Sequence, residues 1–102
     1  MRALELDVSW DPAKARSNLA KHGVSFAQAA TVLLDPLALT IFDTTHSEDE
    51  ERWFTLGQSS DGALLAVAHT YHIAGPTSAQ VRVISARRAT RRERDQYQDT
   101  LR

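Results

Sequence analysis

The chain has 102 residues, of which 42% are hydrophobic and 25% are charged, so it predicts one globular domain spanning residues 1–102. It contains no cysteine, which excludes disulfides, thiolate nucleophiles and cysteine-ligated zinc. The formal net charge of -1 hides a strong segregation. From His22 to Gln80 the only Lys or Arg is Arg52, whereas six of the 12 Lys and Arg residues fall between Arg82 and Arg94. The field near the end of the chain is therefore positive despite the total.

The N-terminal third predicts a strand followed by two helices. Residues 4–10 alternate between apolar and polar side chains, the period of a half-buried strand. Asp11, followed by Pro12, is a typical start of a helix, and Gly23 is a typical end. Ser25 opens a capping box for a second helix, which stops at Asp35 and Pro36. A helical hairpin therefore follows the first strand.

The remainder predicts strands and a last helix. The predicted strands cover residues 37–42, 52–58, 64–72 and 80–86. The acidic segment 43–51 is a solvated connection in which Glu48 or Glu51 pairs with Arg52, and Ala74–Ser78 is a breaker-rich loop. Thr90 and Glu93 form the capping box of the final helix. The predicted fold class is α+β: an N-terminal strand, a two-helix hairpin, an antiparallel meander and a C-terminal helix, with the helices on one sheet face.

The arginine cluster near the C-terminus is the first candidate site. Strand alternation predicts Arg82 and Arg88 on one face and Arg87 on the other. Helical spacing of three and four residues favours one shared face for Arg87, Arg91 and Arg94. Guanidinium groups fork onto phosphate oxygens, and the helix N-terminus adds backbone donors, so the cluster predicts phosphate binding. The alternative is a solvated helix surface whose arginines pair with Glu93, Asp95 and Asp99.

A histidine and a second basic group are further candidates. His69 and Tyr71 alternate onto one strand face, where histidine suits proton transfer and tyrosine can stack on a base. The alternative for His69 is a hydrogen-bonded residue at the sheet surface. Lys14 and Lys21 lie seven residues apart on one face of the first helix, which is either part of a phosphate-binding surface or a solvated face.

Metal and membrane sites are not predicted. The surroundings of His46 match no zinc or EF-hand spacing, and neither a glycine-rich phosphate loop nor a paired-carboxylate motif is present. Any chemistry would therefore use Arg, Lys, His and Tyr without a metal or cofactor. Residues 1–7 lack the apolar run of a signal peptide, and no segment reaches membrane-spanning length. We expect a cytoplasmic protein with no membrane contact.

A series of short motifs runs through almost the whole chain. It comprises Trp10-Asp11-Pro12-Ala13-Lys14, Asn18, Lys21-His22-Gly23-Val24-Ser25-Phe26, Asp35-Pro36, His46-Ser47, Glu50-Glu51-Arg52, Leu56-Gly57 and Ile84-Ser85-Ala86-Arg87-Arg88-Ala89. This series resembles the BrnT family, bacterial toxins of type II toxin–antitoxin systems. The resemblance implies a RelE-like ribonuclease fold and RNA cleavage that inhibits translation.

The resemblance also implies partners. A BrnA-type antitoxin with a ribbon-helix-helix domain would neutralise the toxin in a heterotetramer, and operator DNA would be reached only through that antitoxin. Two features depart from the family pattern. The turn 58–63 carries no arginine where relatives often have one, and the loop 73–79 is longer than usual.

The predicted mechanism is metal-independent RNA cleavage by attack of the ribose 2′-hydroxyl on the adjacent phosphate. We assign charge stabilisation to Arg87 and Arg88, supported by Arg82 and Lys14, and proton transfer to His69. The expected RNA-binding residues are Lys14, Lys21, Tyr71, Arg91 and Tyr97, and the two tyrosines are also weaker candidates for proton transfer. Together these residues are expected to line one groove. The competing interpretation is a non-catalytic RelE-like module that holds an antitoxin or contributes to operator repression.

Overall fold

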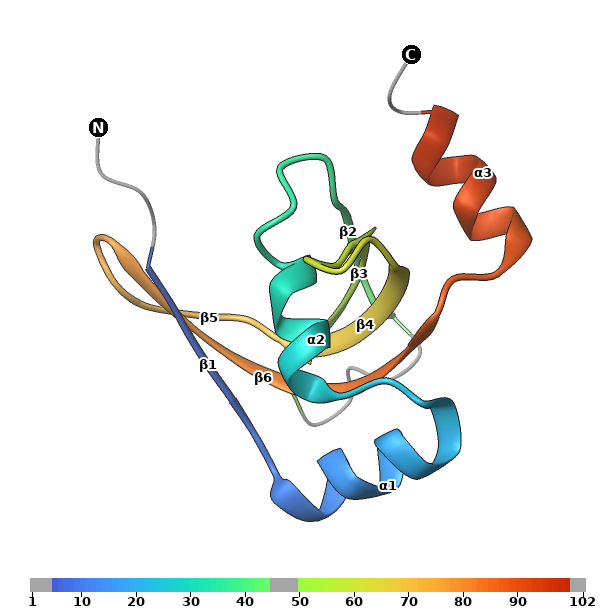
Figure 1. The fold of residues 1–102 in the computed structure, drawn as a ribbon. Coiled ribbons are helices and arrows are strands. Elements are labelled where there is room, and N and C mark those ends of the chain that lie inside the picture. Colours follow the sequence, from blue (N-terminus) through green and yellow to red (C-terminus); the bar gives the residue numbers. More distant parts are fainter. Residues whose placement is uncertain (1–4, 45–49, 100–102) are drawn as a thin grey trace.

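The computed structural model describes residues 5–44 and 50–99 (Figure 1). The elements in chain order are β1 (Glu5–Trp10), α1 (Pro12–His22), α2 (Phe26–Val32), β2 (Leu39–Phe42), β3 (Arg52–Gln58), β4 (Leu64–Thr70), β5 (His72–Gly75), β6 (Ser78–Arg88) and α3 (Arg91–Asp99). This order confirms the α+β class and the predicted succession of strand, two helices, sheet and final helix. The longest helix in the described ranges has 11 residues, and none of these helices could cross a membrane.

The helix boundaries follow local capping chemistry. The carboxylate of Asp11 accepts a hydrogen bond from the N–H of Ala13 at 3.1 Å, and Gly23 ends α1 with a left-handed φ of 69°. The hydroxyl of Ser25 accepts from the N–H of Gln28 at 3.0 Å. Helix α2 ends at Val32, earlier than predicted, because the next three N–H groups bond to carbonyls three residues back rather than four.

The sheet is not a pure antiparallel meander. Its strand order is β1-β6-β4-β3-β2, and β5 pairs with β6 off this path. Strand β1 runs parallel to β6, in register from Glu5 opposite Ser78 to Trp10 opposite Val83. The other pairs are antiparallel, which confirms the predicted antiparallel sheet, and β1, whose pairing the sequence does not predict, joins it in parallel. A parallel pair requires a long connection, and the two helices with the rest of the sheet supply it.

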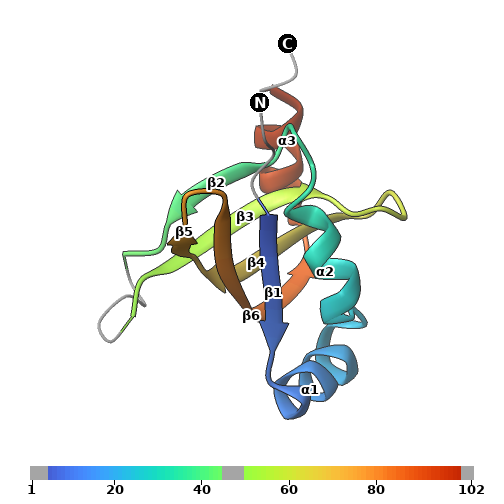
Figure 2. The same cartoon turned by 90° about the vertical axis from the view of Figure 1, so that its left-hand side faces the viewer.

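The predicted loop between the last two strands contains a strand of its own. Strand β4 ends at Thr70, and after Tyr71 the chain continues as β5, with Ile73 opposite Ala79 on β6. Strands β5 and β6 therefore form a hairpin arm beside β1 (Figure 2). At the other edge, β2 begins at Leu39 rather than residue 37, because the chain before it still forms a turn.

Helices pack on both faces of the sheet, and alternation along β4 shows which face each covers. Leu65 and Val67 share a core with Phe26 and Val32 of α2, whereas Ala66, with its neighbour Leu64, packs with Tyr97 of α3. We call these the α2 face and the α3 face. The prediction that all helices lie on one face is therefore wrong. Figure 2 shows α1 and α2 together on one side of the sheet.

Candidate functional site

A β-bulge in β6 decides which arginines lie together. Opposite β4, Ala68 pairs with Ser85, but the next residue, His69, pairs with Val83. Ile84 is therefore an extra residue on β6, and an extra residue shifts the alternation of all side chains that follow.

The shift brings Arg82 and Arg87 onto the same face. Val83 and Ala86 both belong to the core under α2, although they are three residues apart. Arg82 and Arg87 flank these core positions and so lie on the α3 face, whereas Arg88 follows the alternation to the α2 face. Strict alternation predicts Arg82 with Arg88, and this prediction is wrong because the extra residue at Ile84 shifts the alternation between Val83 and Ala86.

The guanidinium of Arg87 is held in a fixed orientation. Its Nη1 and Nη2 donate to the two carboxylate oxygens of Glu93 at 2.7 and 3.0 Å, and its Cζ lies 5.5 Å from the centre of the Phe54 ring. The hydrogen bond with Arg87 lowers the pKa of Glu93 to about 2, and the same bond raises the pKa of Arg87. Because the Arg87 side chain remains 38% exposed, part of its surface is available to a ligand.

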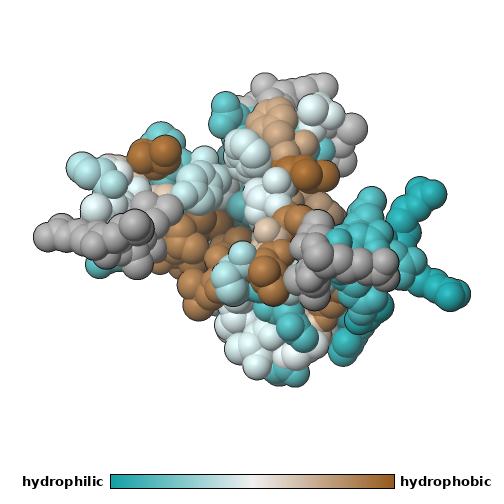
Figure 3. Space-filling view, turned by 90° about the horizontal axis from the view of Figure 1, so that it is seen from above, coloured by the Kyte–Doolittle hydropathy of each residue, from teal (hydrophilic) through white to brown (hydrophobic). Residues whose placement is uncertain are grey.

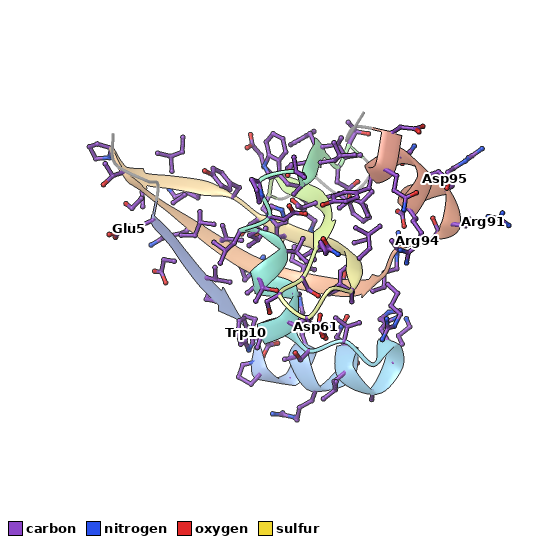
Figure 4. The ribbon with its side chains drawn as sticks, turned by 45° about the horizontal axis from the view of Figure 1, so that its top comes forward. Glu5, Trp10, Asp61, Arg91, Arg94 and Asp95 are labelled. Atoms are coloured by element: carbon purple, nitrogen blue, oxygen red, sulfur yellow. The ribbon has the colours of Figure 1, made fainter. Side chains whose placement is uncertain are left out.

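Glu93 also fixes the start of α3. It accepts from the N–H of Thr90 at 2.8 Å, and its own N–H donates to the Thr90 hydroxyl at 3.2 Å, which confirms the predicted capping box. Arg87 is therefore a strand residue joined to α3 through Glu93, and it does not share a helical face with Arg91 and Arg94. Both of these side chains are exposed, and Figure 4 shows Arg91 pointing from α3 into solvent.

A second arginine pair lies on the same face, nearer the end of β4. The Nη2 of Arg82 contacts a carboxylate oxygen of Glu50, and the Nε of Arg52 lies 4.0 Å from the same oxygen. The predicted partner of Arg52 is Glu48 or Glu51; the structure places Glu50 there, and Glu48 lies outside the described residues. A cavity of about 290 Å³ opens beside Arg82 and Glu50. We call Arg52, Arg82 and Arg87 the arginine face.

Helix α1 reaches the same stretch of β6 from the side. The buried Asn18 bonds both backbone groups of Ala86, immediately before Arg87 and Arg88 in the chain. Lys14 and Lys21 lie four residues before and three after Asn18, so they flank it on the helix and are exposed. The Asn18 contacts therefore hold α1 beside the stretch of β6 that leads into Arg87 and Arg88.

His69 lies on the other side of the sheet. It is 2% exposed, its Nδ1 donates to the carbonyl of Thr70 at 3.0 Å, and its Nε2 therefore accepts from the Thr55 hydroxyl at 2.7 Å. The Thr55 hydroxyl in turn accepts from that of Thr40 at 2.9 Å. Burial lowers the pKa of His69, which favours the neutral ring.

The predicted groove of His69, Tyr71 and the paired arginines is therefore wrong. His69 pairs with Trp53 and faces the helical hairpin, and Tyr71 lines cavities on this α2 face. Arg82 and Arg87 lie on the α3 face, on the opposite side of the sheet from His69 and Tyr71. The bulge that separates these residues occurs at the His69 pairing itself, so strand alternation alone could not reveal it.

The buried His69 predicts a specific pH dependence of stability. Because its pKa is lower in the folded chain, the unfolded chain binds more protons once the pH falls below about 6.5. We expect the urea midpoint to be level above about pH 7 and to fall as the pH drops from about 6.5 to 5. The Glu93 contribution is lost only at lower pH, between its ordinary pKa of 4.5 and about 2. His69→Gln should flatten the curve between pH 5 and 7; an unchanged slope would refute the assignment.

Tyr97 is a core residue and not an RNA ligand. It is 6% exposed, and its hydroxyl donates to the Asp35 carboxylate at 2.6 Å. Burial and this hydrogen bond raise its pKa to about 12, which disfavours the ionised phenol near neutral pH. Burial alone would raise the pKa of Asp35, but hydrogen bonds from the N–H of Gln58, from Tyr97 and from the N–H of Leu37 outweigh it, and the net pKa is lowered.

No metal centre is found in the described part of the chain. Ranges 5–44 and 50–99 hold no group of three or more His, Asp or Glu side chains suited to a cation. His46, whose surroundings in the sequence match no metal-binding spacing, lies outside these ranges.

Two residues of the site were not among the sequence-based candidates. Phe54 lies under Arg87, and Glu50 contacts Arg82. Glu93, which orients Arg87, is visible in the sequence as a capping residue and as a partner of the arginines in the alternative interpretation, although its spacing of six from Arg87 gives no helical signal. The Phe54 contact depends on strand order, which the sequence does not show.

The sequence and the fold are similar to those of known ribonuclease toxins. A family model described as "Ribonuclease toxin, BrnT, of type II toxin-antitoxin system" matches residues 10–93. The crystal structure of the Brucella abortus ribonuclease toxin BrnT is similar, with a TM-score of 0.57 at 25% identity, covering 84% of this chain and 99% of that one. No protein with a curated description matches the chain. The family match spans most of the sequence, and the chain therefore belongs to the BrnT family of ribonuclease toxins of type II toxin–antitoxin systems.

Proposed function

We propose that this ribonuclease toxin is a metal-independent endoribonuclease that inhibits translation and is neutralised by a BrnA-type antitoxin, a ribbon-helix-helix protein. The observation that carries the site assignment is the fixed guanidinium of Arg87, which Glu93 holds over the Phe54 ring while 38% of the Arg87 side chain stays exposed. A preorganised cation at a fixed position suits charge that develops on a phosphate.

In the proposed reaction the ribose 2′-hydroxyl oxygen attacks the neighbouring phosphorus atom. The bond from phosphorus to the 5′-oxygen of the next nucleotide breaks, which gives a 2′,3′-cyclic phosphate and a 5′-hydroxyl. The proton of the 2′-hydroxyl leaves, and the departing 5′-oxygen gains one. Arg87 would stabilise the added negative charge of the pentavalent phosphorus, and a single donor in such a role contributes roughly a hundred- to a thousand-fold.

In this proposal the neighbouring Arg and Lys side chains bind the RNA backbone. The β4 positions opposite Arg87 and Arg82 are four residues apart, which is roughly 13 Å along β4. The two arginines therefore contact different phosphates of the RNA. Arg88, Lys14 and Lys21 would extend the positive surface around the edge of β6. His69 takes no direct part, because both of its ring nitrogens are engaged behind the sheet.

One observation favours the non-catalytic alternative. Arg82 and Arg87 are already paired with Glu50 and Glu93, as expected of a structural surface that only holds an antitoxin. The Arg87 pair uses Nη1 and Nη2 toward one carboxylate and leaves the exposed part of the group for a second ligand. The two alternatives therefore make different predictions for activity rather than for binding.

Induced expression in bacteria without antitoxin separates them. We expect growth arrest accompanied by shortened transcripts, and cleavage of single-stranded RNA by the purified chain in excess chelator, with cyclic phosphate at the new 3′ ends. Co-expression of the antitoxin should restore growth. Harmless expression with intact transcripts would support the binding module instead.

A further inference from the structure

A hollow of about 540 Å³ lies on the α2 face, on the opposite side of the sheet from the arginine face. It is lined by Thr40, Glu51, Trp53, His69, Tyr71, His72 and Ile73. A smaller cavity of about 190 Å³ shares Thr40, His69 and Tyr71 with it. The hollow forms where the chain turns from β4 into β5 and the β5–β6 arm diverges from β3 and β2. Figure 3 shows hydrophobic atoms between this arm, at the left, and the centre of the molecule.

Large apolar side chains are exposed around this hollow. Ile73 is 69% exposed on β5, and Phe42 is 40% exposed on β2, where its ring meets Trp53 edge-on at 5.1 Å. Apolar side chains of this size left in water at the rim of a cavity are typical of a binding surface.

The edge of the sheet beside the hollow is also open. Strand β2 pairs with β3 on one side, and no other strand within residues 5–44 and 50–99 pairs with its outer edge. Thr40 lines the hollow and Phe42 alternates onto the same face, whereas Ile41 points to the α3 face. A strand added to β2 would therefore place alternate side chains toward the hollow and the others toward the arginine face.

The charge around the hollow indicates which class of ligand it can bind. Every residue lining the hollow comes from the stretch between His22 and Gln80, where Arg52 is the only Lys or Arg. Glu51 lines the hollow and is exposed, and the other ionisable side chains in its lining are His69, Tyr71 and His72. Such a rim repels phosphate and attracts Lys or Arg, so a protein segment fits here better than RNA.

We propose that the hollow and the β2 edge bind an extended segment of the antitoxin, with apolar side chains in the hollow and a flanking Lys or Arg beside Glu51. The identity of the partner rests on the proposed function. The segment adds a strand to β2, and its side chains on the α3 face reach toward Phe54 and the arginine face. An antitoxin segment bound at the hollow and the β2 edge is thereby placed to cover the arginine face, where RNA is proposed to bind.

The test is the affinity of purified antitoxin for surface variants, measured by isothermal titration calorimetry. Ile73→Asp puts a charge into the apolar rim and should weaken binding at least tenfold. Leu19→Asp is the matched control, since Leu19 is 52% exposed on α1, and it should bind normally. Glu51→Lys should weaken binding, whereas Glu5→Lys, which changes an exposed acid on β1, should not. All four variants should retain the thermal midpoint and RNA cleavage of the parent.

The outcomes distinguish this inference from the proposed function. Equal affinity of Ile73→Asp and the parent for antitoxin would overturn the docking site, whatever the cleavage assay shows. Lack of cleavage by every variant and the parent would remove the ribonuclease proposal while leaving the binding comparison valid. If Ile73→Asp instead abolished self-association in gel filtration or binding of RNA, the occupant would be a second copy or RNA, and the proposal would be wrong.

Discussion

Replacing Arg87 and Arg88 together by alanine is expected to lower RNA cleavage by at least about a hundredfold and to abolish growth arrest. The physical reason is the loss of the oriented guanidinium over Phe54 together with its neighbour at the edge of β6. The measurement is the initial rate of cleavage of a labelled single-stranded RNA in excess chelator. Arg87→Lys keeps a charge but loses the forked bonds to Glu93, so it should have an intermediate rate.

The control for this pair is Arg91→Ala with Arg94→Ala. This variant also removes two positive charges, but it removes them from α3, where both side chains are exposed. If charge alone mattered, the two double variants would lose activity equally. We expect the α3 pair to retain most of the rate and to reduce mainly the salt dependence of binding. Full toxicity of a folded Arg87 and Arg88 double variant would show that the assignment is wrong.

Among the proposed substitutions, Asn18→Ala should lower the free energy of unfolding the most. Its side-chain amide donates to the carbonyls of Val24 at 2.9 Å and Ala86 at 2.8 Å, and its oxygen accepts from the N–H of Ala86 at 3.0 Å. Strand β1 ends opposite Val83, and the Asn18 side chain takes the place of a neighbouring strand for Ala86. Three buried backbone groups would lose their partners at roughly 1–3 kcal/mol each.

The expected total is about 3–5 kcal/mol, a large part of the 5–15 kcal/mol typical of a domain. Urea unfolding measures it. Asn18→Asp tests the hydrogen bonds apart from the packing, because it keeps the shape but places a carboxylate beside two carbonyls. It should be about as damaging as alanine. Ser17→Ala, one residue earlier and exposed, should change stability by less than about 0.5 kcal/mol. A loss below about 1 kcal/mol for Asn18→Ala would contradict the strand-replacement role.

Local chemistry made much of the fold predictable. The caps at Asp11, Ser25 and Thr90 and the left-handed Gly23 act within four residues, so the sequence shows them directly. Strands β3 and β4 begin where their patterns predict. Strand β6 begins at Ser78 rather than at the predicted residue 80. Its first residues pair with β5, and the sequence of β5 is typical of a loop.

Long-range features could not be read in the same way. The parallel pairing of β1 with β6 depends on where the helical hairpin carries the chain. The bulge at Ile84 changes the face of Arg87 relative to Arg82, and strict alternation along the strand does not allow for such an extra residue. The sequence therefore predicted the importance of the arginines, whereas their partners and the position of His69 required the structure.

The central claim is that RNA binds the sheet face bearing Arg82 and Arg87. The most direct measurement is an NMR titration of the ¹⁵N-labelled chain with a 2′-O-methyl RNA, which cannot undergo 2′-hydroxyl attack. We predict the largest shifts at Ser85, Arg82 and Arg87 and near-constant signals at Thr55 and His69. Shifts concentrated around Thr55 and His69, with Arg82 and Arg87 unmoved, would contradict it.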